Sequence, residues 1–398
     1  MCGIVGFVNN KDNKEKIIKD MSKKIEHRGP DGEGVYIDEN CALAHRRLAI
    51  IDLNTGTQPI YNEDKSIVII YNGEVYNFKE LKKTLLKKKH VFKTKTDTEV
   101  ILHGYEQWGE KLPSHLRGMF AFAIWDKNKK ELFMARDGFG IKPLYYAKFN
   151  DTFMFASEPK AFLVNPDFEK ILNKDILSAY LCFNSVPTSE TFFKGVFRLE
   201  PGTYLIYKDG NIKTESFFKF DFKEKNDNIE NIVDNIDKVM KNSVEYHQIS
   251  DVEVGSFLSS GIDSSYIVSL AKPDKTFTVG YDNPKFDEIS YAKDLSDKLG
   301  IENFSKKITM DEYIDAFPKI IYYMDEPLAD PSAIALYFVS EIASSKVKVV
   351  LSGEGADEFF AGYNSYQEEL TMQGYMKIPY FIRHIVSNIV SLFPDIRG

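Results

Sequence analysis

Cysteine is scarce in this sequence. The 398 residues contain three cysteines, Cys2, Cys41 and Cys182. Three scattered cysteines are too few for a disulfide framework, and their spacing does not match a structural zinc site. Because disulfides persist in oxidising compartments and are rare in the cytosol, this scarcity favours a cytoplasmic protein.

Long apolar runs and an excess of basic residues are also missing. No apolar run approaches the roughly 20 residues of a membrane-spanning helix, and the first residues do not resemble a secretion signal. The net charge of −8 does not indicate a nucleic-acid or anionic-membrane partner. The composition is that of an ordinary globular protein, and the length suggests two or three domains.

The first residues, Met1-Cys2-Gly3, are the first chemical signal. If Met1 is removed, Cys2 carries both a thiol and a free α-amine. A terminal amine titrates near pKa ~7.7–8.0, so it can take and return a proton at neutral pH. Nucleophile and base can then belong to one residue. Taken alone, a cysteine at position 2 more often occurs by chance and has no catalytic role. The remainder of the chain decides between a chance cysteine and a catalytic one.

The first half predicts short strands joined by turns. Strands are expected at residues 2–8, 35–37, 41–50, 67–71, 120–125 and 131–135, with hairpin turns at 126–130, 149–151 and 208–211. Helices are expected before Glu26, over residues 78–89 and after residues 96–99. This pattern to about Phe220 indicates an α+β domain with antiparallel sheets.

Asn72-Gly73 permits two interpretations. Asn-Gly is a common hairpin turn, which would end the strand at Tyr71. Alternatively, an Asn amide beside an unhindered glycine N–H provides two donors for a developing oxyanion.

The pattern changes after residues 220–228, which are polar and charged and predict a linker. A helix is expected at residues 229–246, then strands at 252–258, 276–280 and 347–351. Helices are expected from Tyr266 onward and at residues 289–299, 313–324, 333–344 and 381–393. Alternating strands and helices predict an α/β domain with a doubly wound parallel sheet, whose ligands bind at the carboxyl ends of the strands.

Two loops follow such strand ends. Residues 259–264 are small and precede a helix, so their N–H groups suit a phosphate, although a plain tight turn is an equal interpretation. A carboxylate there, Asp263, makes sense if it holds Mg²⁺. Residues 352–358 place three carboxylates among two glycines, where a solvated acidic turn is the alternative. From the first loop we expect Ser259, Gly261, Asp263 and Ser264 to bind ATP.

The first half resembles the glutaminase domain of class II glutamine amidotransferases, whose αββα fold carries an N-terminal nucleophile. The resemblance rests on six motifs in order: Cys2-Gly3-Ile4-Val5-Gly6, His27-Arg28-Gly29-Pro30-Asp31, His45-Arg46-Arg47-Leu48-Ala49-Ile50, Tyr71-Asn72-Gly73-Glu74, Thr96-Asp97-Thr98-Glu99 and Ala135-Arg136-Asp137. It implies that Cys2 attacks glutamine, that Asn72 and Gly73 stabilise the oxyanion, that Arg47 binds the substrate carboxylate, and that Glu74 and Asp97 bind its α-ammonium.

The second half resembles the ATP-pyrophosphatase domain of glutamine-hydrolysing asparagine synthetases. Both loops match, as do Asp325-Glu326-Pro327 and Asp330-Pro331-Ser332-Ala333, although Ser260 stands where the family has the first of two glycines. The resemblance implies that Leu258, Val279, Ser352 and Gly353 contact the adenosine, that Glu354 acts at the aspartyl-adenylate step, and that Asp263 and Asp357 bind Mg²⁺. The family's chains continue past residue 398, so we expect this sequence to be C-terminally incomplete.

The leading hypothesis is an ATP-dependent asparagine synthetase with domains at residues 2–219 and 229–398. Its substrates would be glutamine, aspartate and ATP, its metal Mg²⁺, and its assembly a homodimer. Ammonia released at Cys2 would attack an aspartyl adenylate. Two alternatives stay open: an enzyme of the same architecture acting on another carboxylate, and a chain that works only as a glutaminase or as a non-catalytic glutamine- or nucleotide-binding subunit.

Overall fold

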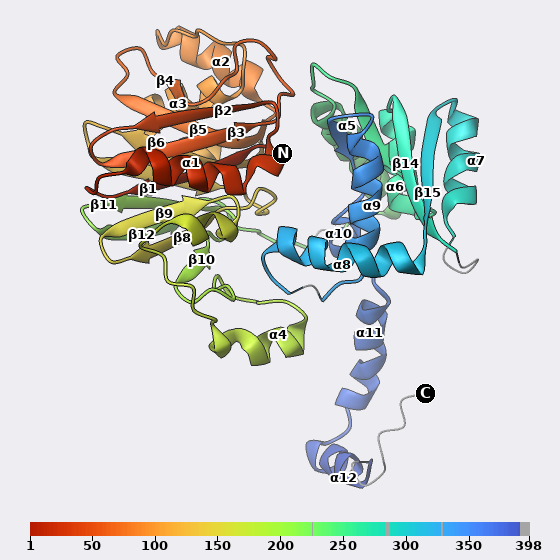
Figure 1. Ribbon diagram of the computed structural model, residues 1–398. Coiled ribbons are helices and arrows are strands. Elements are labelled where there is room, and N and C mark those ends of the chain that lie inside the picture. The colour runs from red at the N-terminus through yellow and green to blue at the C-terminus, as the bar shows by residue number, and fades with distance from the viewer. Residues whose placement is uncertain (225, 283–286, 328, 391–398) are drawn as a thin grey trace.

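The computed structural model describes residues 1–224, 226–282, 287–327 and 329–390. Two stacked sheets with flanking helices make up the first part of the chain, and a parallel sheet flanked by helices makes up the second (Figure 1). Residues 217–224 and 226–228 have no regular structure and lie between the two parts.

The first sheet is antiparallel and contains the N-terminal strand. Its spatial order is β10 (Val196–Arg198), β8 (Tyr145–Phe149), β9 (Thr152–Ala156), β1 (Gly3–Val8), β3 (Cys41–Arg47) and β2 (Gly32–Ile37). In the register of β1 with β3, Ile4 lies opposite His45. The β-branched and aromatic residues of β1 explain why this segment forms a buried strand.

The second sheet is also antiparallel and packs against the first. Its order is β12 (Asn211–Ser216), β11 (Thr203–Lys208), β7 (Glu131–Arg136), β6 (Gly118–Asp126), β5 (Ile67–Val75) and β4 (Ile60–Tyr61). Side chains alternate along its strands: Val68 and Ile70 face the first sheet, whereas Ile69 and Tyr71 face the helices on the other side.

Helices cover the outer face of each sheet, which completes an αββα sandwich. Helix α1 (Lys14–Lys24) buries Ile18 and Met21 on the first sheet. Helices α2 (Phe78–Lys87) and α3 (Thr98–Trp108) cover the second. The remaining helical segments here are short: η1 (Glu26–Arg28), η2 (Gly109–His115), η3 (Pro159–Val164), η4 (Lys174–Ile176) and α4 (Leu177–Phe183).

The second part is built on a four-stranded parallel sheet. Its order is β15 (Glu302–Ile308), β14 (Lys275–Tyr281), β13 (Val254–Phe257) and β16 (Val349–Leu351). Helices α6 (Ile262–Ala271) and α7 (Ile289–Leu299) cover one face, and α8 (Met310–Met324) and α9 (Ser332–Ser344) the other. The strand order reverses at β13, so the carboxyl ends of β13 and β16 mark the switch point where ligands bind in such sheets.

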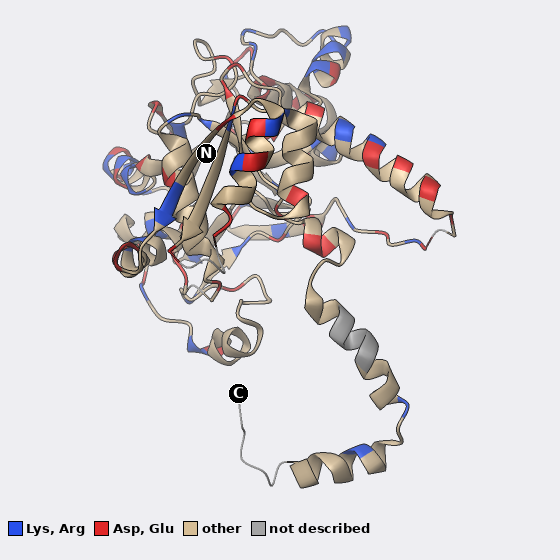
Figure 2. Cartoon of the chain, turned by 90° about the vertical axis from the view of Figure 1, so that its right-hand side faces the viewer, with Lys and Arg blue, Asp and Glu red and all other residues tan. Residues whose placement is uncertain are grey.

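The other helices are α5 (Ile229–His247), which precedes β13, and α10 (Ala356–Phe360), which follows β16. Helices α11 (Asn364–Met376) and α12 (Tyr380–Val390) extend away from the sheet. Residues of both charge signs are interspersed over the two parts (Figure 2). Within the described residues, every helix is too short or too polar to span a bilayer.

Most predicted elements form where the sequence places them, although several boundaries differ, including those beside predicted site residues. Strand β5 continues through Asn72-Gly73 to Val75 instead of turning after Tyr71, because β6 pairs with it along this whole length. The turn interpretation of Asn-Gly is therefore wrong.

Helices α6 and α10 begin at Ile262 and Ala356, inside the predicted loops, so Asp263 and Asp357 lie in first helical turns. The expected helix at residues 381–393 is confirmed to Val390; its last apolar position, Leu392, lies outside the described residues.

Candidate active sites

Cys2 lies immediately before β1, at the edge of the sandwich. Its Sγ accepts a hydrogen bond from the Leu48 N–H at 3.3 Å and lies 3.6 Å from the Leu48 carbonyl oxygen. Its own carbonyl accepts a hydrogen bond from Arg28 Nε at 2.9 Å. Burial raises the pKa of the Cys2 thiol, and the Leu48 N–H and Arg28 act against that rise. The resting thiol is therefore protonated and needs a base before it can attack.

The chain terminus beside Cys2 is a candidate for that base. Burial, followed by the nearby charge of Arg28, lowers the pKa of the Met1 amine to about 5. An amine with that pKa is uncharged at neutral pH and can accept a proton. The described chain retains Met1, so this amine belongs to Met1 and not to Cys2.

Strand alternation aims the predicted residues into one space between the sheets. Side chains two or four residues apart along an extended strand lie on the same face of the sheet. Cys2, just before β1, therefore shares a face with Ile4, and Arg47 on β3 shares a face with Leu43. Asn72 and Glu74 share the parity of Val68 and Ile70 on β5. Ile4, Leu43, Val68 and Ile70 all belong to the core between the sheets. The His45 imidazole, opposite Ile4 in register, lies 3.1 Å from the Tyr71 carbonyl oxygen, which places the Asn72 segment beside the start of β1.

Asn72 carries a donor that the fold leaves free. The residue is 1% exposed, and within the described part of the chain its Nδ2 has no hydrogen-bond partner. A buried amide costs free energy unless something accepts its hydrogen bond. A developing oxyanion is such an acceptor, so this feature agrees with the predicted role.

Gly73 offers a second donor at the same edge. The N–H groups of Tyr71 and Val75 point away from β6, to Gln58 Oε1 at 2.6 Å and Asp97 Oδ2 at 2.9 Å. Gly73 is two residues from both Tyr71 and Val75 along β5, so its N–H also points away from β6. A β-carbon at Gly73 would lie 2.2 Å from the Met119 carbonyl oxygen, so only glycine fits.

Glu74 and Asp97 form a buried acidic pair. Burial, followed by the charge of Asp97, raises the pKa of Glu74 to about 9. Burial raises the pKa of Asp97 as well, but Asp97 accepts hydrogen bonds from the Tyr71 hydroxyl at 2.8 Å and the Val75 N–H at 2.9 Å. These bonds favour its ionised form, so Glu74 is the member that holds a proton at neutral pH. The pair is ready to receive a cation.

Arg47 is held by backbone carbonyls of the following loop. Its Nη2 donates to Asp52 at 2.6 Å and Ile51 at 3.3 Å, and its Nη1 donates to Leu53 at 3.3 Å. Gly56 packs closely: a β-carbon there would lie 2.4 Å from Arg47 Nη2. Among the described residues, no carboxylate lies within ion-pair distance of Arg47. Its charge is positioned by neutral groups and is available to a substrate carboxylate.

Lys142 is a buried cation near this site that the sequence analysis missed. It is 6% exposed, and its Nζ lies 3.3 Å from the Met1 sulfur. Burial lowers its pKa, while the charge of Glu74 raises it. The surrounding Gly140-Ile141-Lys142-Pro143 predicts only a turn, and no local signal distinguishes this lysine from a surface lysine.

In the second part, the two predicted loops lie side by side. Strands β13 and β16 are parallel neighbours, with Ser256 opposite Leu351. A β-carbon on Gly353 would lie 3.1 Å from the Ser264 backbone nitrogen and 3.2 Å from Asp263 Cβ. Helix α6 begins after Gly261 without a side-chain cap, so donors of its first turn are available to an anion.

The loop before α6 is ordered by its serines. The Ser259 N–H donates to Ser264 Oγ, and the Gly261 N–H donates to Ser259 Oγ, both at 3.1 Å. Leu258 is buried, with its N–H bonded to the Phe277 carbonyl at 2.9 Å and its own carbonyl accepting from the Thr278 hydroxyl at 2.8 Å.

The other predicted residues of this site lie at the same sheet end. Val279 follows Thr278 on β14, and Ser352 follows the last residue of β16. Ser352 Oγ accepts a hydrogen bond from the Glu354 N–H at 3.3 Å. Asp357 packs against Gly362, where a β-carbon would lie 2.0 Å from its Oδ1. Within the described chain, Asp263, Glu354 and Asp357 do not form a cluster of three metal-ligating groups.

Buried ion pairs connect the two parts. Lys160, 2% exposed, contacts Glu158 Oε2 at 2.5 Å in its own domain and Asp325 Oδ2 at 3.0 Å at the end of α8. Glu158 Oε1 also lies 2.9 Å from Arg28 Nη1, and Arg28 is bonded to the Cys2 carbonyl. A continuous series of contacts thus joins Cys2 to the second domain.

Two domain families match this sequence. The glutamine amidotransferase domain matches residues 1–218, and the asparagine synthase domain matches residues 235–390. The interval between the two matches contains the segment without regular structure.

Whole proteins with the same arrangement are similar to this chain. Asparagine synthetase (glutamine-hydrolyzing) 1 of Bacillus subtilis is 45% identical over 410 residues, covering 100% of this chain and 65% of its own. A Methanocaldococcus jannaschii protein named for the same activity is 35% identical over 432 residues, covering 100% and 82%. The solved glutamine phosphoribosylpyrophosphate amidotransferase of B. subtilis covers 76% of this chain and 65% of its own at 20% identity and a TM-score of 0.42, which supports no argument about function. The chain spans just under two thirds of the first relative's length.

Proposed function

The chain belongs to the glutamine-hydrolysing asparagine synthetase family, and from that premise we propose that it converts aspartate to asparagine with ammonia taken from glutamine and energy taken from ATP. The observation that carries the proposal is the buried Asn72 amide, which has no partner among the described residues and lies on the face that Cys2 shares. We propose a glutaminase domain at residues 2–219, a linker at 220–228 and a synthetase domain at 229–398.

In the first half-reaction, Cys2 Sγ attacks the side-chain carbonyl of glutamine. The terminal amine accepts the thiol proton and passes it to the leaving nitrogen, so the C–N bond breaks and ammonia departs. Asn72 Nδ2 and the Gly73 N–H donate to the oxyanion. Arg47 binds the substrate carboxylate, and Glu74 with Asp97 binds the α-ammonium. Water then hydrolyses the thioester to release glutamate.

The proton step requires a free amine at Cys2, which removal of Met1 would create. The amine at Met1 is uncharged because it is buried and lies near the cationic Arg28 and Lys142. An α-amine on Cys2 would lie within reach of the same charges, which favour its neutral form.

In the second half-reaction, the aspartate side-chain carboxylate attacks the α-phosphorus of ATP, and pyrophosphate leaves. We propose that Ser259, Gly261, Asp263 and Ser264 hold the phosphates, and that Leu258, Val279, Ser352 and Gly353 contact the adenosine. A β-carbon at Gly353 would lie 3.1 Å from the Ser264 backbone nitrogen, at the start of α6, where we propose that the phosphates bind. Ammonia attacks the acyl carbon of the aspartyl adenylate, the bond to AMP breaks, and asparagine forms as AMP and a proton leave, with Glu354 acting at this step.

Mg²⁺ fits the donor set of this site. Asp263 and Asp357 offer carboxylate oxygens, and Mg²⁺ is commonly bound by one or two carboxylates together with substrate phosphates. When bound, the ion would neutralise charge on the phosphates. We further propose a cytoplasmic location and a homodimer.

The proposal is tested by measuring glutamate, pyrophosphate and asparagine together from glutamine, aspartate and Mg·ATP. Equal yields are expected. Glutamate alone would indicate a glutaminase, and pyrophosphate only with another acid would indicate a different acceptor; either result overturns the proposed reaction.

The Cys2→Ala variant separates the two sites. It should lose glutamine-dependent asparagine formation and retain the ammonia-dependent reaction, because ammonia bypasses the thioester. Cys182→Ala, at an exposed position, is the matched control and should retain both activities. Loss of both activities in Cys2→Ala would contradict the two-site scheme.

A further inference from the structure

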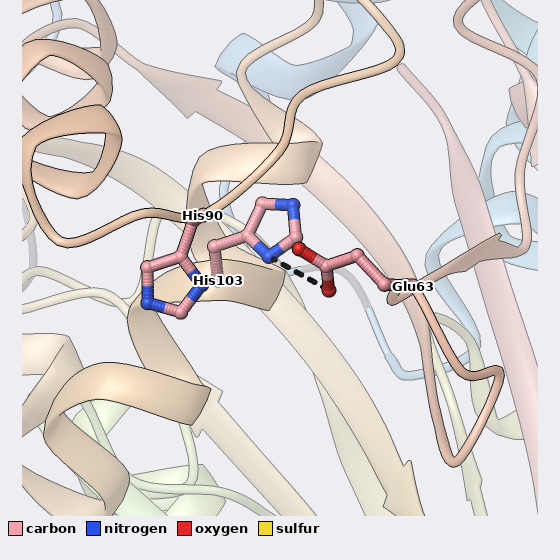
Figure 3. A group of neighbouring side chains, drawn as sticks. All are labelled: Glu63, His90 and His103. Carbon is pink, nitrogen blue, oxygen red and sulfur yellow. Dashed lines mark ion pairs between the residues drawn. The ribbon is translucent and has the colours of Figure 1, made fainter.

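Three segments of the first domain bring two histidines and two glutamates together, away from Cys2. Glu63 lies in the β4–β5 connection, His90 in the α2–α3 connection, and His103 and Glu106 on α3. Figure 3 shows the carboxylate of Glu63 and the rings of His90 and His103 directed toward one another. We propose that Glu63, His90 and His103 bind a zinc ion, with Glu106 as the fourth ligand.

The donor atoms lie close enough for one ion. One atom from each of Glu63, His90 and His103 falls within 4.8 Å of the others. Glu63 Oε2 is 3.9 Å from His103 Nδ1, and Glu106 Oε2 is 2.7 Å from that nitrogen and 3.5 Å from His90 Nδ1. Ligands of tetrahedral zinc at bond lengths of ~2.0–2.1 Å are separated by about 3.3 Å, so modest side-chain rotations complete the site.

Neighbouring groups orient the ligands as they do around known metal centres. His103 is 1% exposed, and its far ring nitrogen, Nε2, faces the buried Glu99 carboxylate at 3.7 Å. A carboxylate behind one imidazole nitrogen leaves the other nitrogen as the metal ligand. Glu106 Oε1 accepts from Asn62 Nδ2 at 2.9 Å, and Glu63 Oε1 accepts from the Val91 N–H at 3.1 Å. Each glutamate therefore keeps its other oxygen, Oε2, for the ion.

The donor chemistry favours zinc over the common hard cations. Two imidazole nitrogens with carboxylate oxygens suit a borderline ion such as Zn²⁺, whereas Mg²⁺ and Ca²⁺ prefer oxygen ligands alone. Without metal, His103 Nδ1 carries a proton that it shares with Glu106. Zinc takes this position, the proton passes to solvent, and Glu106 changes from hydrogen-bond acceptor to ligand.

Zinc at this site would hold the α2–α3 connection, which leads to Asp97, against α3. His90 lies seven residues before Asp97 along the chain, and α3 starts directly after Asp97. Glu99 fixes the intervening loop through the N–H groups of Lys93 at 2.8 Å and Thr94 at 2.7 Å. The ion is a structural one in this proposal, because it connects three segments and does not touch the glutamine site.

The experiment is dialysis of the metal-free full chain against zinc chloride, followed by metal analysis and zinc X-ray absorption. The comparison is between the parent chain, the Glu63→Gln/His90→Gln variant, and His384→Gln on the exposed face of α12 as the matched control. We expect one zinc per chain with only nitrogen and oxygen ligands at about 2.0–2.1 Å. The double variant should lose at least about tenfold in affinity, and the control should bind like the parent.

Zinc binding should also raise the melting temperature of the parent and of His384→Gln but not that of the double variant. Circular dichroism of each variant verifies its fold; of the two substituted ligands, Glu63 is exposed and His90 is half-buried. Absence of uptake by the parent, sulfur ligands in the absorption spectrum, or equal uptake by the double variant would each overturn the proposal. Absence of uptake would leave His103 as an imidazolium held between Glu99 and Glu106.

Discussion

At the residue scale, the unpartnered amide of Asn72 gives the sharpest expectation. Asn72→Ala should lower kcat for glutamine hydrolysis about 10²–10³-fold, the usual effect of losing one oxyanion donor, with a smaller change in KM. Steady-state glutamate release measures this effect. Asn9→Ala is the matched control, since Asn9 is also a buried asparagine but its amide is already bonded to Thr152 at 3.0 Å. An unchanged kcat in Asn72→Ala would remove Asn72 from the oxyanion site.

The buried pair of Glu74 and Asp97 predicts a proton release when glutamine binds. The pKa of Glu74 is about 9, raised by burial and by Asp97, so it is protonated in the free protein at neutral pH. The α-ammonium of glutamine favours the ionised carboxylate, so binding should expel this proton, and affinity should rise as pH increases from about 7 toward 9. Calorimetry of Cys2→Ala in buffers of different ionisation enthalpy counts the protons.

The control for this titration is Glu74→Gln in the same background. Glutamine's own amine titrates in both proteins, so the difference between them isolates Glu74. Equal proton release from the two proteins would show that Glu74 is ionised before glutamine arrives.

For single residues, the sequence predicts a chemical role but not the surroundings of the side chain. Residue types and motif order predict roles for Cys2, Asn72 and Asp97, and those roles stay predictions; the fold places Cys2 and Asn72 on one face. Lys142 was missed because its burial results from the packing of the chain terminus and the strands around it. The residues around Lys142 in the sequence do not indicate its contact with Met1 or its proximity to Glu74.

At the element scale, the close approach of the two loops at the carboxyl ends of β13 and β16 can be tested at Gly353. Gly353→Ala would place a β-carbon 3.1 Å from the Ser264 nitrogen, where we propose that a phosphate binds. The KM for ATP should rise by about tenfold or more, while glutaminase activity stays unchanged. Pyrophosphate release against ATP concentration measures this change. Gly374→Ala, on α11, is the control, because its β-carbon would meet nothing within 4 Å. Equal KM values for the two variants would contradict the assignment.

Element type was predictable from periodicity, but element ends were not. Short apolar runs rich in β-branched residues predicted β1, β5 and β13. Strand β5 extends beyond its predicted end because pairing with β6 overrides the weak strand preference of Asn and Gly. Strand β15 was not predicted at all. Its sequence, Glu302 to Ile308, is largely polar, and its pairing with β14 creates a strand that propensity alone does not indicate.

At the scale of the whole molecule, we expect Lys160 to stabilise the interface between the two domains. Lys160→Met would leave Asp325 without its buried partner, while Glu158 would keep Arg28 at 2.9 Å, at a cost of about 3–5 kcal/mol in the free energy of unfolding. Urea denaturation measures the stability, and proteolysis near residues 220–228 measures domain separation. Lys11→Met is the control: its ion pair with Asp167 is exposed on the lysine side, and its loss should cost under about 1 kcal/mol. A similar small cost for Lys160→Met would show that other contacts hold the domains.

The two-domain plan followed from the sequence because the change of pattern after residue 220 separates two kinds of fold. The way the domains meet did not follow from it. Asp325-Glu326 was recognised only as a motif, and nothing local indicates that Asp325 contacts Lys160, more than 160 residues earlier, or that Arg198 lies 3.1 Å from Glu326. Interfaces of this kind depend on distant pairs whose members look like ordinary surface charges.

The burial of Lys160 has a consequence for how the protein responds to its ionic surroundings. Dissolved salt weakens charge pairs that water can reach, since counterions gather around both partners, but it acts little on pairs shielded by protein. With Lys160 2% exposed and the Asp325 side chain 6% exposed, counterions have almost no access to this contact. We therefore expect concentrated salt, which separates subunits joined by surface charges, to leave this ion pair intact, so that the contacts between Cys2 and the neighbouring domain keep their geometry across a wide range of ionic strength.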